Sequence, residues 1–396
     1  MMHIVFDAQP LVDNGKTGVG YCEAGIVTAL QSQYTEHDYM FNYFAFRDAR
    51  EKAGRLRQFV RGDSRSRVCA WFDESLYRIL WNFVPVPYRW FFGKSAQITH
   101  FFNYHVPPGV PGKTVATVHD MSYKAFPETV RFKTRFMLNL SLRRSCRRAD
   151  KILTDSEFSK AEIIKYLKLS EDKLVVCPCG VDHRMYRPSA DRQEIARIKE
   201  KYGIHGDYFL YLGMLEPRKN IERLLEAYAI LKKERPDAAA LVLAGRKGWL
   251  YDSIFTRASA LELNDNVLFT GYVDDGDKPP LLRGALAFVF PSLYEGFGLP
   301  PLEAMACGTP VLTSNAASLP EVVGDAALLV DPGSVDEIAA GLTRLWADEA
   351  LREELSRKGL ERARRFTWGR AAEIVMDVYT ELAGEHNAQN QSSADQ

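Results

Sequence analysis

Short apolar runs alternate with amphipathic stretches along most of the chain, and this alternation occurs twice. Apolar runs of this length, bounded by turn residues, are typical of buried strands in parallel sheets. The first series predicts strands at His3 to Ala8, Asp38 to Phe46, Ile98 to Asn103, Lys113 to Val118, Lys151 to Thr154 and Lys173 to Cys177. The second series predicts strands at Tyr208 to Leu212, Ala240 to Ala244, Val267 to Thr270, Ala285 to Phe290, Val311 to Thr313 and Ala327 to Val330. Strands that alternate with amphipathic helices predict an α/β protein with two doubly wound parallel-sheet domains.

The segment between the two series, residues 182–203, loses strand character and contains Pro188-Ser189, which marks a domain boundary. We therefore expect domains at residues 1–186 and 187–366, each with its ligands outside the carboxyl ends of its strands. Two such sheets facing each other would form a cleft. The stretch Arg47 to Arg67 is polar and predicts a solvated loop with at most one helix, and residues 384–396 predict a disordered tail because they are almost without apolar residues.

The most informative stretch is Glu295 to Gly308 (EGFGLPPLEAMACG), which follows the strand at Ala285 to Phe290. Two prolines suit the first turn of a helix, and the last glycine suits its end. Glu295 then lies in the loop at the end of the strand, and Glu303 lies about one to two turns into the helix. Two carboxylates suit sugar hydroxyls and a helix N-terminus suits phosphate, so the stretch predicts a nucleotide-sugar site.

A second stretch, Tyr208 to Asn220 (YFLYLGMLEPRKN), carries a buried strand that ends at Gly213. The loop that follows brings Arg218 and Lys219 to the start of the next helix. Two cations beside a helix N-terminus suit a diphosphate. The alternative is a pair of exposed surface charges.

In the first domain, His119 and Asp120 end a strand on the side of the expected cleft. The histidine could donate to a sugar oxygen or share the proton transfer, or it could cap the strand end. Gly18 and Gly20 lie in a glycine-rich loop that predicts an active-site loop, with a flexible turn as the alternative. The proper glycine fingerprint of a dinucleotide cofactor is absent, which argues against a nicotinamide dehydrogenase.

Two further stretches allow contact with a membrane. Leu76 to Lys94 interleaves large aromatic residues with basic ones, and Arg143, Arg144, Arg147 and Arg148 share one helical face. The alternatives are a core helix followed by a proline-broken connection, and a solvated face.

Composition narrows the class of protein. The 396 residues contain 46% apolar and 26% charged residues, with 51 acidic and 51 basic side chains, so no nucleic-acid partner is expected. Six cysteines are scattered, and Cys177 and Cys179 are too close for a usual zinc pair, which indicates reduced thiols of a cytosolic protein. We expect no signal peptide and no membrane span.

The sequence resembles the retaining glycosyltransferases of the GT-B fold, with two Rossmann-like domains, that form the group 1 family, also called family 4. That family's hallmark is two glutamates separated by seven residues in the second domain, the spacing of Glu295 and Glu303 within EGFGLPPLEAMACGTPV. The segments TDSEFSK, CGVD, EPRKN and LPEVVGDAALLVDP occur in the family's order. The resemblance covers about residues 3–383.

The resemblance implies an acceptor site in the first domain and a donor site in the second. It also implies that the helix at 367–383 crosses back to the first domain. Glu303 would bind the ribose hydroxyls, Glu295 would contact the donor sugar, and Arg218 and Lys219 would neutralise the leaving diphosphate. The expected donor-binding residues are Gly18, Gly20, Gly213, Arg218, Lys219, Gly271, Tyr272, Glu295, Gly296, Phe297, Gly298, Leu299 and Glu303, with His119, Glu295, Arg218 and Lys219 in catalysis. Met214 departs from the family pattern, in which an arginine often follows the glycine of the phosphate loop.

The implied reaction is transfer of a hexose to a hydroxyl of a glycan or lipid-linked glycan, with a donor phosphate oxygen taking the acceptor's proton. No metal or cofactor is expected, because the chain shows no Asp-x-Asp motif near the phosphate site. The motifs resemble bacterial mannosyltransferases of O-antigen or exopolysaccharide assembly, so GDP-mannose is the expected donor; rhamnose, glucose, galactose and N-acetylglucosamine stay open. A cytoplasmic protein, peripheral at the inner membrane, is expected. The alternatives are a sugar-nucleotide epimerase and a non-catalytic nucleotide-sugar-binding subunit.

Overall fold

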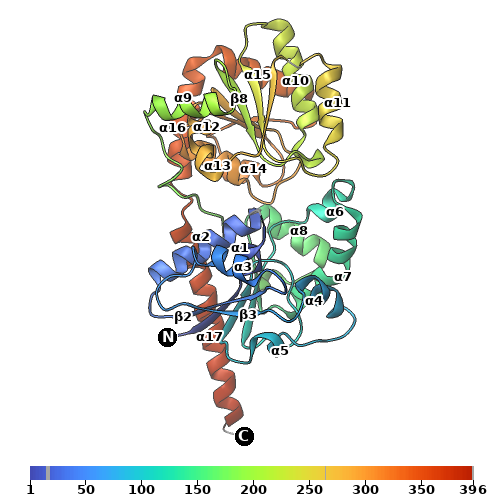
Figure 1. Ribbon diagram of the computed structural model, residues 1–396, viewed down its shortest axis with the longest axis vertical. Helices are drawn as coiled ribbons and strands as arrows, with labels where there is room; N and C mark the ends of the chain where they lie inside the picture. Colours follow the sequence, from blue (N-terminus) through green and yellow to red (C-terminus); the bar gives the residue numbers. More distant parts are fainter. Residues whose placement is uncertain (15–17, 264, 395–396) are drawn as a thin grey trace. The chain divides into compact units, whose positions relative to one another are not determined.

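The computed structural model describes residues 1–14, 18–263 and 265–394 and divides the chain into two compact units (Figure 1). Unit 1 comprises Met1–Tyr123, Phe132–Gly180 and Trp368–Gln396, and unit 2 comprises Lys124–Arg131 and Val181–Thr367. The expected boundary between residues 186 and 187 lies a short way into unit 2. Each unit contains one parallel sheet, so the predicted class of two doubly wound α/β domains is confirmed.

Unit 1 has a seven-stranded sheet in the order β3-β2-β1-β4-β5-β6-β7, in which all paired strands are parallel. Its strands are β1 (His3–Asp7), β2 (Asp38–Phe44), β3 (Arg65–Cys69), β4 (Ile98–Phe101), β5 (Lys113–Thr117), β6 (Lys151–Thr154) and β7 (Leu174–Val176). Its helices are α1 (Gln9–Val12), α2 (Gly18–Gln33), α3 (Ala49–Leu56), α4 (Glu74–Leu80), α5 (Arg89–Phe92), α7 (Phe132–Arg148), α8 (Glu157–Leu167) and α17 (Trp368–Ala394), while α6 (Ser122–Ala125) leads into unit 2. The strand order reverses between β1 and β4.

Unit 2 has a six-stranded parallel sheet in the order β10-β9-β8-β11-β12-β13. Its strands are β8 (Tyr208–Leu212), β9 (Ala240–Ala244), β10 (Val267–Gly271), β11 (Ala287–Phe290), β12 (Val311–Ser314) and β13 (Leu328–Val330). Its helices are α9 (Arg192–Lys201), α10 (Ile221–Glu234), α11 (Asp252–Ala260), α12 (Lys278–Arg283), α13 (Leu299–Ala306), α14 (Leu319–Val323), α15 (Val335–Ala347) and α16 (Glu349–Ala363). Helices α10, α11 and α15 pack together on one face, and α12, α13 and α16 lie on the other (Figure 1).

The apolar runs form the strands because they are buried on both faces. Every residue of β8 and of β11 is buried, which explains why these strands read as continuous apolar runs rather than alternating ones. Some helices start where the sequence offers a capping side chain. Ser156 accepts a hydrogen bond from the N–H of Ser159 at the start of α8, and Asp348 caps α16 in the same way.

The stretch Arg47 to Arg67 is not only a loop and helix, as its polarity predicts, because β3 begins within it at Arg65. This strand lies at the edge of the sheet, so most of its side chains are exposed and its sequence, RSRVC, lacks the apolar character of an inner strand.

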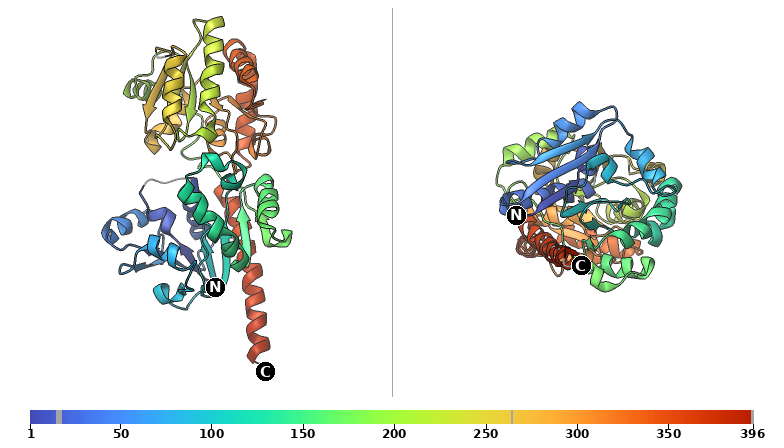
Figure 2. Two further views of the ribbon diagram at one scale, coloured as in Figure 1. Left: turned by 90° about the vertical axis from the view of Figure 1, so that its right-hand side faces the viewer. Right: turned by 90° about the horizontal axis from the view of Figure 1, so that it is seen from below.

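The C-terminal helix α17 packs on unit 1, against α2, β4 and β5 (Figure 1 and Figure 2). It continues to Ala394, through most of the stretch for which the sequence predicts disorder; residues 395 and 396 lie outside the described part of the chain. Among the described residues, we find no helix with both the length and the apolar character that a membrane span requires.

Candidate active site

Most of the residues expected to act on the donor lie at one edge of the unit 2 sheet. The strand order reverses between β8 and β11, whose connections lead to opposite faces of the sheet. Doubly wound sheets bind their ligands at this switch point, outside the carboxyl ends of the strands. The turn after β8 carries Arg218 and Lys219, and the loop after β11 carries Glu295, so the fold brings the three side chains together.

Glu295 binds both cations. Lys219 Nζ lies 2.6 Å from Oε1 of Glu295, and Arg218 Nη1 lies 3.0 Å from Oε2. The other terminal nitrogen of Arg218 lies 2.9 Å from Oε1 of Glu216. All four side chains are largely buried, with at most 16% of any of them exposed. Arg218 and Lys219 are therefore not exposed surface charges, and in the structure they pair with the carboxylate that the sequence assigns to the sugar.

The electrostatics of this cluster favour the charged form of Glu295 in spite of burial. Burial opposes the charge on Glu295, yet the cations of Arg218 and Lys219 lower its pKa to about 2. Burial also lowers the pKa of Lys219, against the opposing effect of Glu295. Glu295 is thus a carboxylate at neutral pH, held by two cations that are themselves largely buried.

The backbone of the loop that carries Glu295 is fixed from two sides. Ser318 Oγ lies 2.9 Å from the carbonyl oxygen of Glu295 and 2.7 Å from that of Phe297, so its hydroxyl donates to this loop. Gly298 has a φ of 132°, which L side chains rarely adopt, and precedes α13. The N–H groups of Gly298 and Leu299 therefore lie at the positive end of a helix, the arrangement that suits phosphate.

Glu303 lies within α13, apart from the Arg218–Glu295–Lys219 cluster. Burial raises its pKa to about 7, although Lys278 and a hydrogen bond with Tyr186 oppose the shift. This carboxyl therefore titrates near neutral pH, unlike Glu295. The two glutamates of the motif have opposite electrostatic environments.

The remaining expected donor residues follow neighbouring strands. Gly271 ends β10 with a φ of 71°, and the next residue, Tyr272, is about half exposed, with the guanidinium of Arg246 4.0 Å from the centre of its ring. Gly213 follows β8, and Gly245 follows β9. A Cβ added to Gly245 would lie 1.8 Å from the carbonyl oxygen of Gly213, so the loops after the two strands approach each other closely. In the motif of the two glutamates, Phe297, which follows Gly296, is buried and packs edge-on against Phe366.

In unit 1, His119 lies just beyond the end of β5 and binds Asp155, which lies just beyond the end of β6. The distance between His119 Nδ1 and Asp155 Oδ2 is 2.7 Å, and Nε2 lies 3.3 Å from the carbonyl oxygen of Phe102. Burial alone would lower the pKa of His119, but the charge and hydrogen bond of Asp155 raise it to about 10. The ring is therefore an imidazolium at neutral pH and suits a hydrogen-bond donor better than a general base.

Gly18 and Gly20 lie in the first turn of α2 rather than in an extended loop. The rest of the predicted glycine-rich loop, residues 15–17, lies outside the described residues.

Several residues of the site escaped the sequence interpretation. Glu216 is buried and binds Arg218, and Ser318 holds the loop of Glu295. Asn220 adopts a left-handed conformation and donates to the carbonyl oxygens of Pro291 and Pro332, which ties the turn after β8 to two other loops. Glu216 and Asn220 flank the two cations in EPRKN, so their position in this motif could have indicated them. Ser318 lies in a different segment, and nothing in the sequence around it indicates its role.

Unit 1 contains a hollow of about 660 Å³ beyond the carboxyl ends of β2 and β3. Its walls carry four carboxylates, three cations and two aromatic rings, from the side chains Asp13, Phe44, Phe46, Arg47, Asp48, Lys52, Asp73, Glu74 and Arg78. Burial raises the pKa of Glu74 to about 6, against the opposing charge of Arg78. The arrangement offers both hydrogen-bond acceptors and apolar surface.

Comparison with known proteins extends these observations. The sequence profile of glycosyl transferases group 1 matches residues 194–362, and that of glycosyltransferase family 4 matches residues 27–185. The O-antigen chain mannosyltransferase B of Escherichia coli is 38% identical over 286 residues, which are 71% of this chain and 74% of that protein. The serotype-specific mannosyltransferase WbdA of the same species is 33% identical over 279 residues, which are 69% of this chain and 34% of that protein.

The structure of Anabaena HepE in complex with UDP and glucose has a TM-score of 0.71 to this chain at 18% identity, and the match covers 96% of this chain and all of that one. Two doubly wound sheets and this likeness define a protein of the GT-B fold. The chain belongs to the group 1 glycosyltransferases, family 4, and is a glycosyltransferase.

Proposed function

We propose that the protein transfers mannose from GDP-mannose to a hydroxyl of a glycan or lipid-linked glycan, with retention of the anomeric configuration. The observation that carries the proposal is the cluster of Glu295 with Arg218 and Lys219 beside the start of α13. The choice of mannose rests on the relatives, which are named mannosyltransferases and match about 70% of this chain. No metal or cofactor is part of the proposal.

In the proposed reaction, the acceptor oxygen forms a bond to the anomeric carbon as the bond to the β-phosphate oxygen breaks. The leaving GDP carries the released charge, which Arg218, Lys219 and the N-terminus of α13 stabilise. A non-bridging oxygen of the same diphosphate takes the acceptor's proton, so no protein base is required. Glu295 stabilises the positive charge that develops on the sugar ring. His119 donates from Nε2 to a sugar oxygen in place of the carbonyl of Phe102.

The donor can be identified by the thermal stability of the purified protein with a panel of nucleotide sugars. We expect GDP and GDP-mannose to raise the melting temperature, and UDP and UDP-glucose to have little effect. Incubation with GDP-mannose and a mannose-terminated oligosaccharide should then give a product with one added α-linked hexose. A shift with UDP alone would overturn GDP-mannose as the donor, and epimerised donor in the absence of acceptor would overturn transfer.

We also propose that the hollow of unit 1 binds the acceptor sugar. Carboxylates accept hydrogen bonds from sugar hydroxyls, and an exposed aromatic ring such as Phe46 packs on the apolar face of a pyranose. The family resemblance implies an acceptor site in this domain, and the mixture of acidic and aromatic side chains in the hollow supports the proposal.

A lipid-linked acceptor is supported by the surface that adjoins the hollow. Helix α4 contributes Glu74 and Arg78 to the hollow, while its residues Leu76 and Ile79 are exposed. The apolar surface continues to Phe83, Val84 and Trp90, of which Phe83 and Trp90 are each about 70% exposed. The predicted core helix therefore accounts for only part of the stretch Leu76 to Lys94.

Basic residues adjoin this apolar surface. Arg144 of α7 donates to the carbonyl oxygen of Asn82 at 3.0 Å, and Arg143 and Arg147 are exposed on the same helix. Aromatic side chains beside arginines suit the interface of an anionic membrane. We therefore propose peripheral binding at the cytoplasmic face of the inner membrane.

Co-sedimentation with vesicles tests this part of the proposal separately. The wild type should bind vesicles rich in phosphatidylglycerol and not vesicles of phosphatidylcholine. The double variant Phe83→Ser, Trp90→Ser should lose most of the binding, whereas Leu250→Ser, which changes an exposed apolar side chain of unit 2, should retain it. Equal binding by all three proteins would overturn the surface assigned to the membrane.

A further inference from the structure

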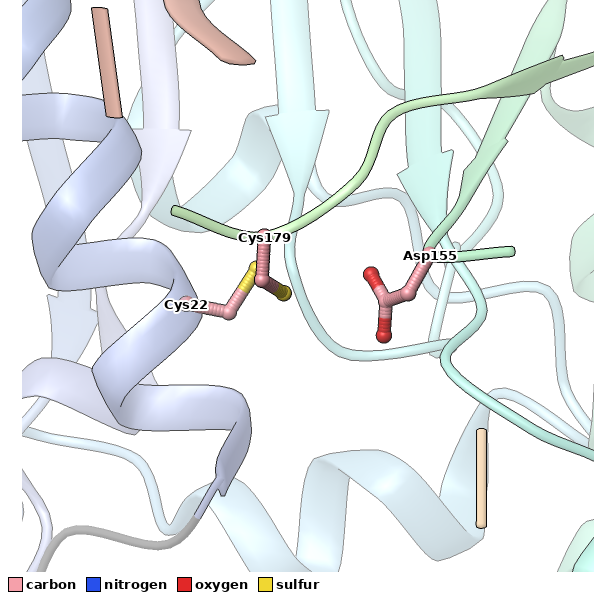
Figure 3. A group of neighbouring side chains, drawn as sticks. All are labelled: Cys22, Asp155 and Cys179. Atoms are coloured by element: carbon pink, nitrogen blue, oxygen red, sulfur yellow. The ribbon is translucent and has the colours of Figure 1, made fainter. Parts of the chain in front are cut away.

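Two thiols and a carboxylate from distant segments of unit 1 converge on one point (Figure 3). The Sγ atoms of Cys22 and Cys179 and a carboxylate oxygen of Asp155 all lie within 4.8 Å of one another. All three residues are buried, and both cysteines are free thiols. Within the described residues, this is the one group of three such side chains that could hold a metal ion.

The fold brings the three together for simple reasons. Strands β6 and β7 are parallel neighbours, so the residues that follow them, Asp155 and Cys179, meet at the same edge of the sheet. The N–H of Cys177 donates to the carbonyl oxygen of Thr154 at 2.7 Å, which extends this pairing beyond the strands. Cys22 enters from the first turns of α2, which lies alongside (Figure 3). The sequence interpretation rejected Cys177 and Cys179 as a zinc pair because they are too close, whereas the structure brings Cys179 together with Cys22.

We propose that Cys22, Cys179 and Asp155 bind a thiophilic divalent cation, with Zn²⁺ as the natural occupant. Two thiolates and a carboxylate form a ligand set that Zn²⁺ accepts, with bonds of about 2.3 Å to sulfur and about 2.0–2.2 Å to oxygen. Tetrahedral geometry then places ligand atoms ~3.5–3.8 Å apart, so side chains already within 4.8 Å need only small movements. Three protein ligands leave one position for water or another oxygen.

The surroundings of Asp155 support the site. His119 Nδ1 lies 2.7 Å from Oδ2 of Asp155 and forms a hydrogen bond with it. A hydrogen bond of this kind to a ligating carboxylate orients the carboxylate towards the metal ion. A bound ion would connect α2, the residue after β6 and the segment that follows β7, and would fix Asp155 as the positioning residue of His119. This inference stands on the geometry of unit 1 alone and does not depend on the proposed donor or acceptor.

Metal binding can be measured on the full-length protein after chelation and gel filtration. We expect one equivalent of Zn²⁺ to bind in competition with a chromophoric chelator, and Co²⁺ to give the intense ultraviolet absorption of thiolate-to-cobalt charge transfer. Cys22→Ser and Cys179→Ser should each weaken binding at least 100-fold, and Asp155→Asn, which replaces a charged ligand oxygen by a neutral one, should also weaken it, but by less than either thiol variant. Cys177→Ser is the matched control, because a hydroxyl can replace the thiol that donates to the carbonyl oxygen of Ala371, and it should bind Zn²⁺ like the wild type.

A second measurement avoids reliance on the variants. Zn²⁺ should protect Cys22 and Cys179 of the wild type from alkylation in mild denaturant, as mapped by mass spectrometry, while the labelling of Cys69 stays unchanged. The proposal is overturned if Co²⁺ gives no thiolate absorption, if Zn²⁺ binds equally well to Cys22→Ser and Cys179→Ser, or if the two thiols are not protected.

Discussion

Lys219 and Glu295 form a largely buried ion pair, with 2.6 Å between Nζ and Oε1, although they belong to loops that follow different strands. Arg218 binds the other carboxylate oxygen at 3.0 Å. The glutamate is thus charged and oriented before any donor arrives, and the two cations are already at the switch point of the sheet. In the proposed reaction, a diphosphate bound there would share cations that are already held in place, so little reorganisation would accompany the transfer.

Replacement of Lys219 by methionine should therefore lower kcat more than it raises the donor KM. We expect kcat to fall by ~10²–10³-fold, the loss typical of one donor that stabilises a developing oxyanion. Lys233→Met, which changes an exposed lysine of α10, is the control and should leave kcat unchanged. Steady-state kinetics with the nucleotide sugar measure both parameters, and normal transfer by the double variant Arg218→Met, Lys219→Met would contradict the assignment.

Glu295 should contribute stability in a defined range of pH. Its folded-state pKa of about 2 lies below the ordinary 4.5, so its contribution is complete above pH 4.5 and is lost as the pH falls towards 2. A shift of this size corresponds to about 3 kcal/mol at neutral pH. Urea unfolding at several pH values should show Glu295→Gln well below the wild type at pH 7, with the difference shrinking below pH 4.5.

The control for this experiment is Glu353→Gln, an exposed glutamate of α16, which should follow the wild type at every pH. A constant difference between the wild type and Glu295→Gln from pH 7 to pH 3 would contradict the ion pair as its source.

Glu303 should make donor binding depend on pH near neutrality. Because its pKa in the free protein is about 7, the carboxylate form of Glu303 predominates only above pH 7. Only the carboxylate can accept hydrogen bonds from both ribose hydroxyls. The affinity for a nucleotide sugar, whose diphosphate does not titrate in this range, should rise from pH 6 to pH 8. Calorimetry should find this rise in the wild type and a weak, flat affinity in Glu303→Gln; an equal rise in the variant would assign the effect to another group.

The sequence predicts which loops form the site, because these loops directly follow strands that can be recognised in the sequence. Apolar runs buried on both faces place the strand ends, and the loops that follow must meet at the carboxyl edge of each sheet. That is why Glu295 and Lys219 could be expected at one site. Which side chains pair there depends on side-chain conformations and on Ser318 from another loop, and neither leaves a periodic pattern.

The hydrophobic pattern of the sequence could not predict the edge strand of the sheet or the contacts between distant segments of the chain. Strand β3 is polar because its side chains are exposed at the edge of the sheet, so it resembles a loop in sequence. The convergence of Cys22 with Cys179 brings α2 together with the segment that follows β7, a contact between parts of the chain that are far apart in sequence. The extent of α17 was also missed, because residues 384–394 carry few apolar side chains.

Carboxylates of the unit 1 hollow should affect the acceptor and not the donor. Asp48→Asn and Glu74→Gln each remove acceptors available to sugar hydroxyls, and a lost hydrogen bond of ~1–1.5 kcal/mol corresponds to about a 10-fold increase in acceptor KM. The donor KM and the slow hydrolysis of donor without acceptor should not change. Glu51→Gln, on α3 outside the hollow, is the control; an increase in donor KM in the two variants would contradict an acceptor role.

Glu23 should make the protein less stable as the pH rises. Its side chain is fully buried on α2, and neither carboxylate oxygen has a hydrogen-bond partner among the described residues. Burial raises its pKa well above 4.5, so the folded protein holds the neutral acid while the unfolded chain releases the proton. The stability from this group is complete below pH 4.5 and is lost as the pH rises towards the folded-state pKa.

Glu23→Gln keeps a neutral side chain of the same size, so the variant should match the wild type at pH 4.5 and exceed it by ~1–3 kcal/mol at pH 8. Urea unfolding at the two pH values checks this, and a variant less stable than the wild type at pH 8 would show that the carboxylate has a partner.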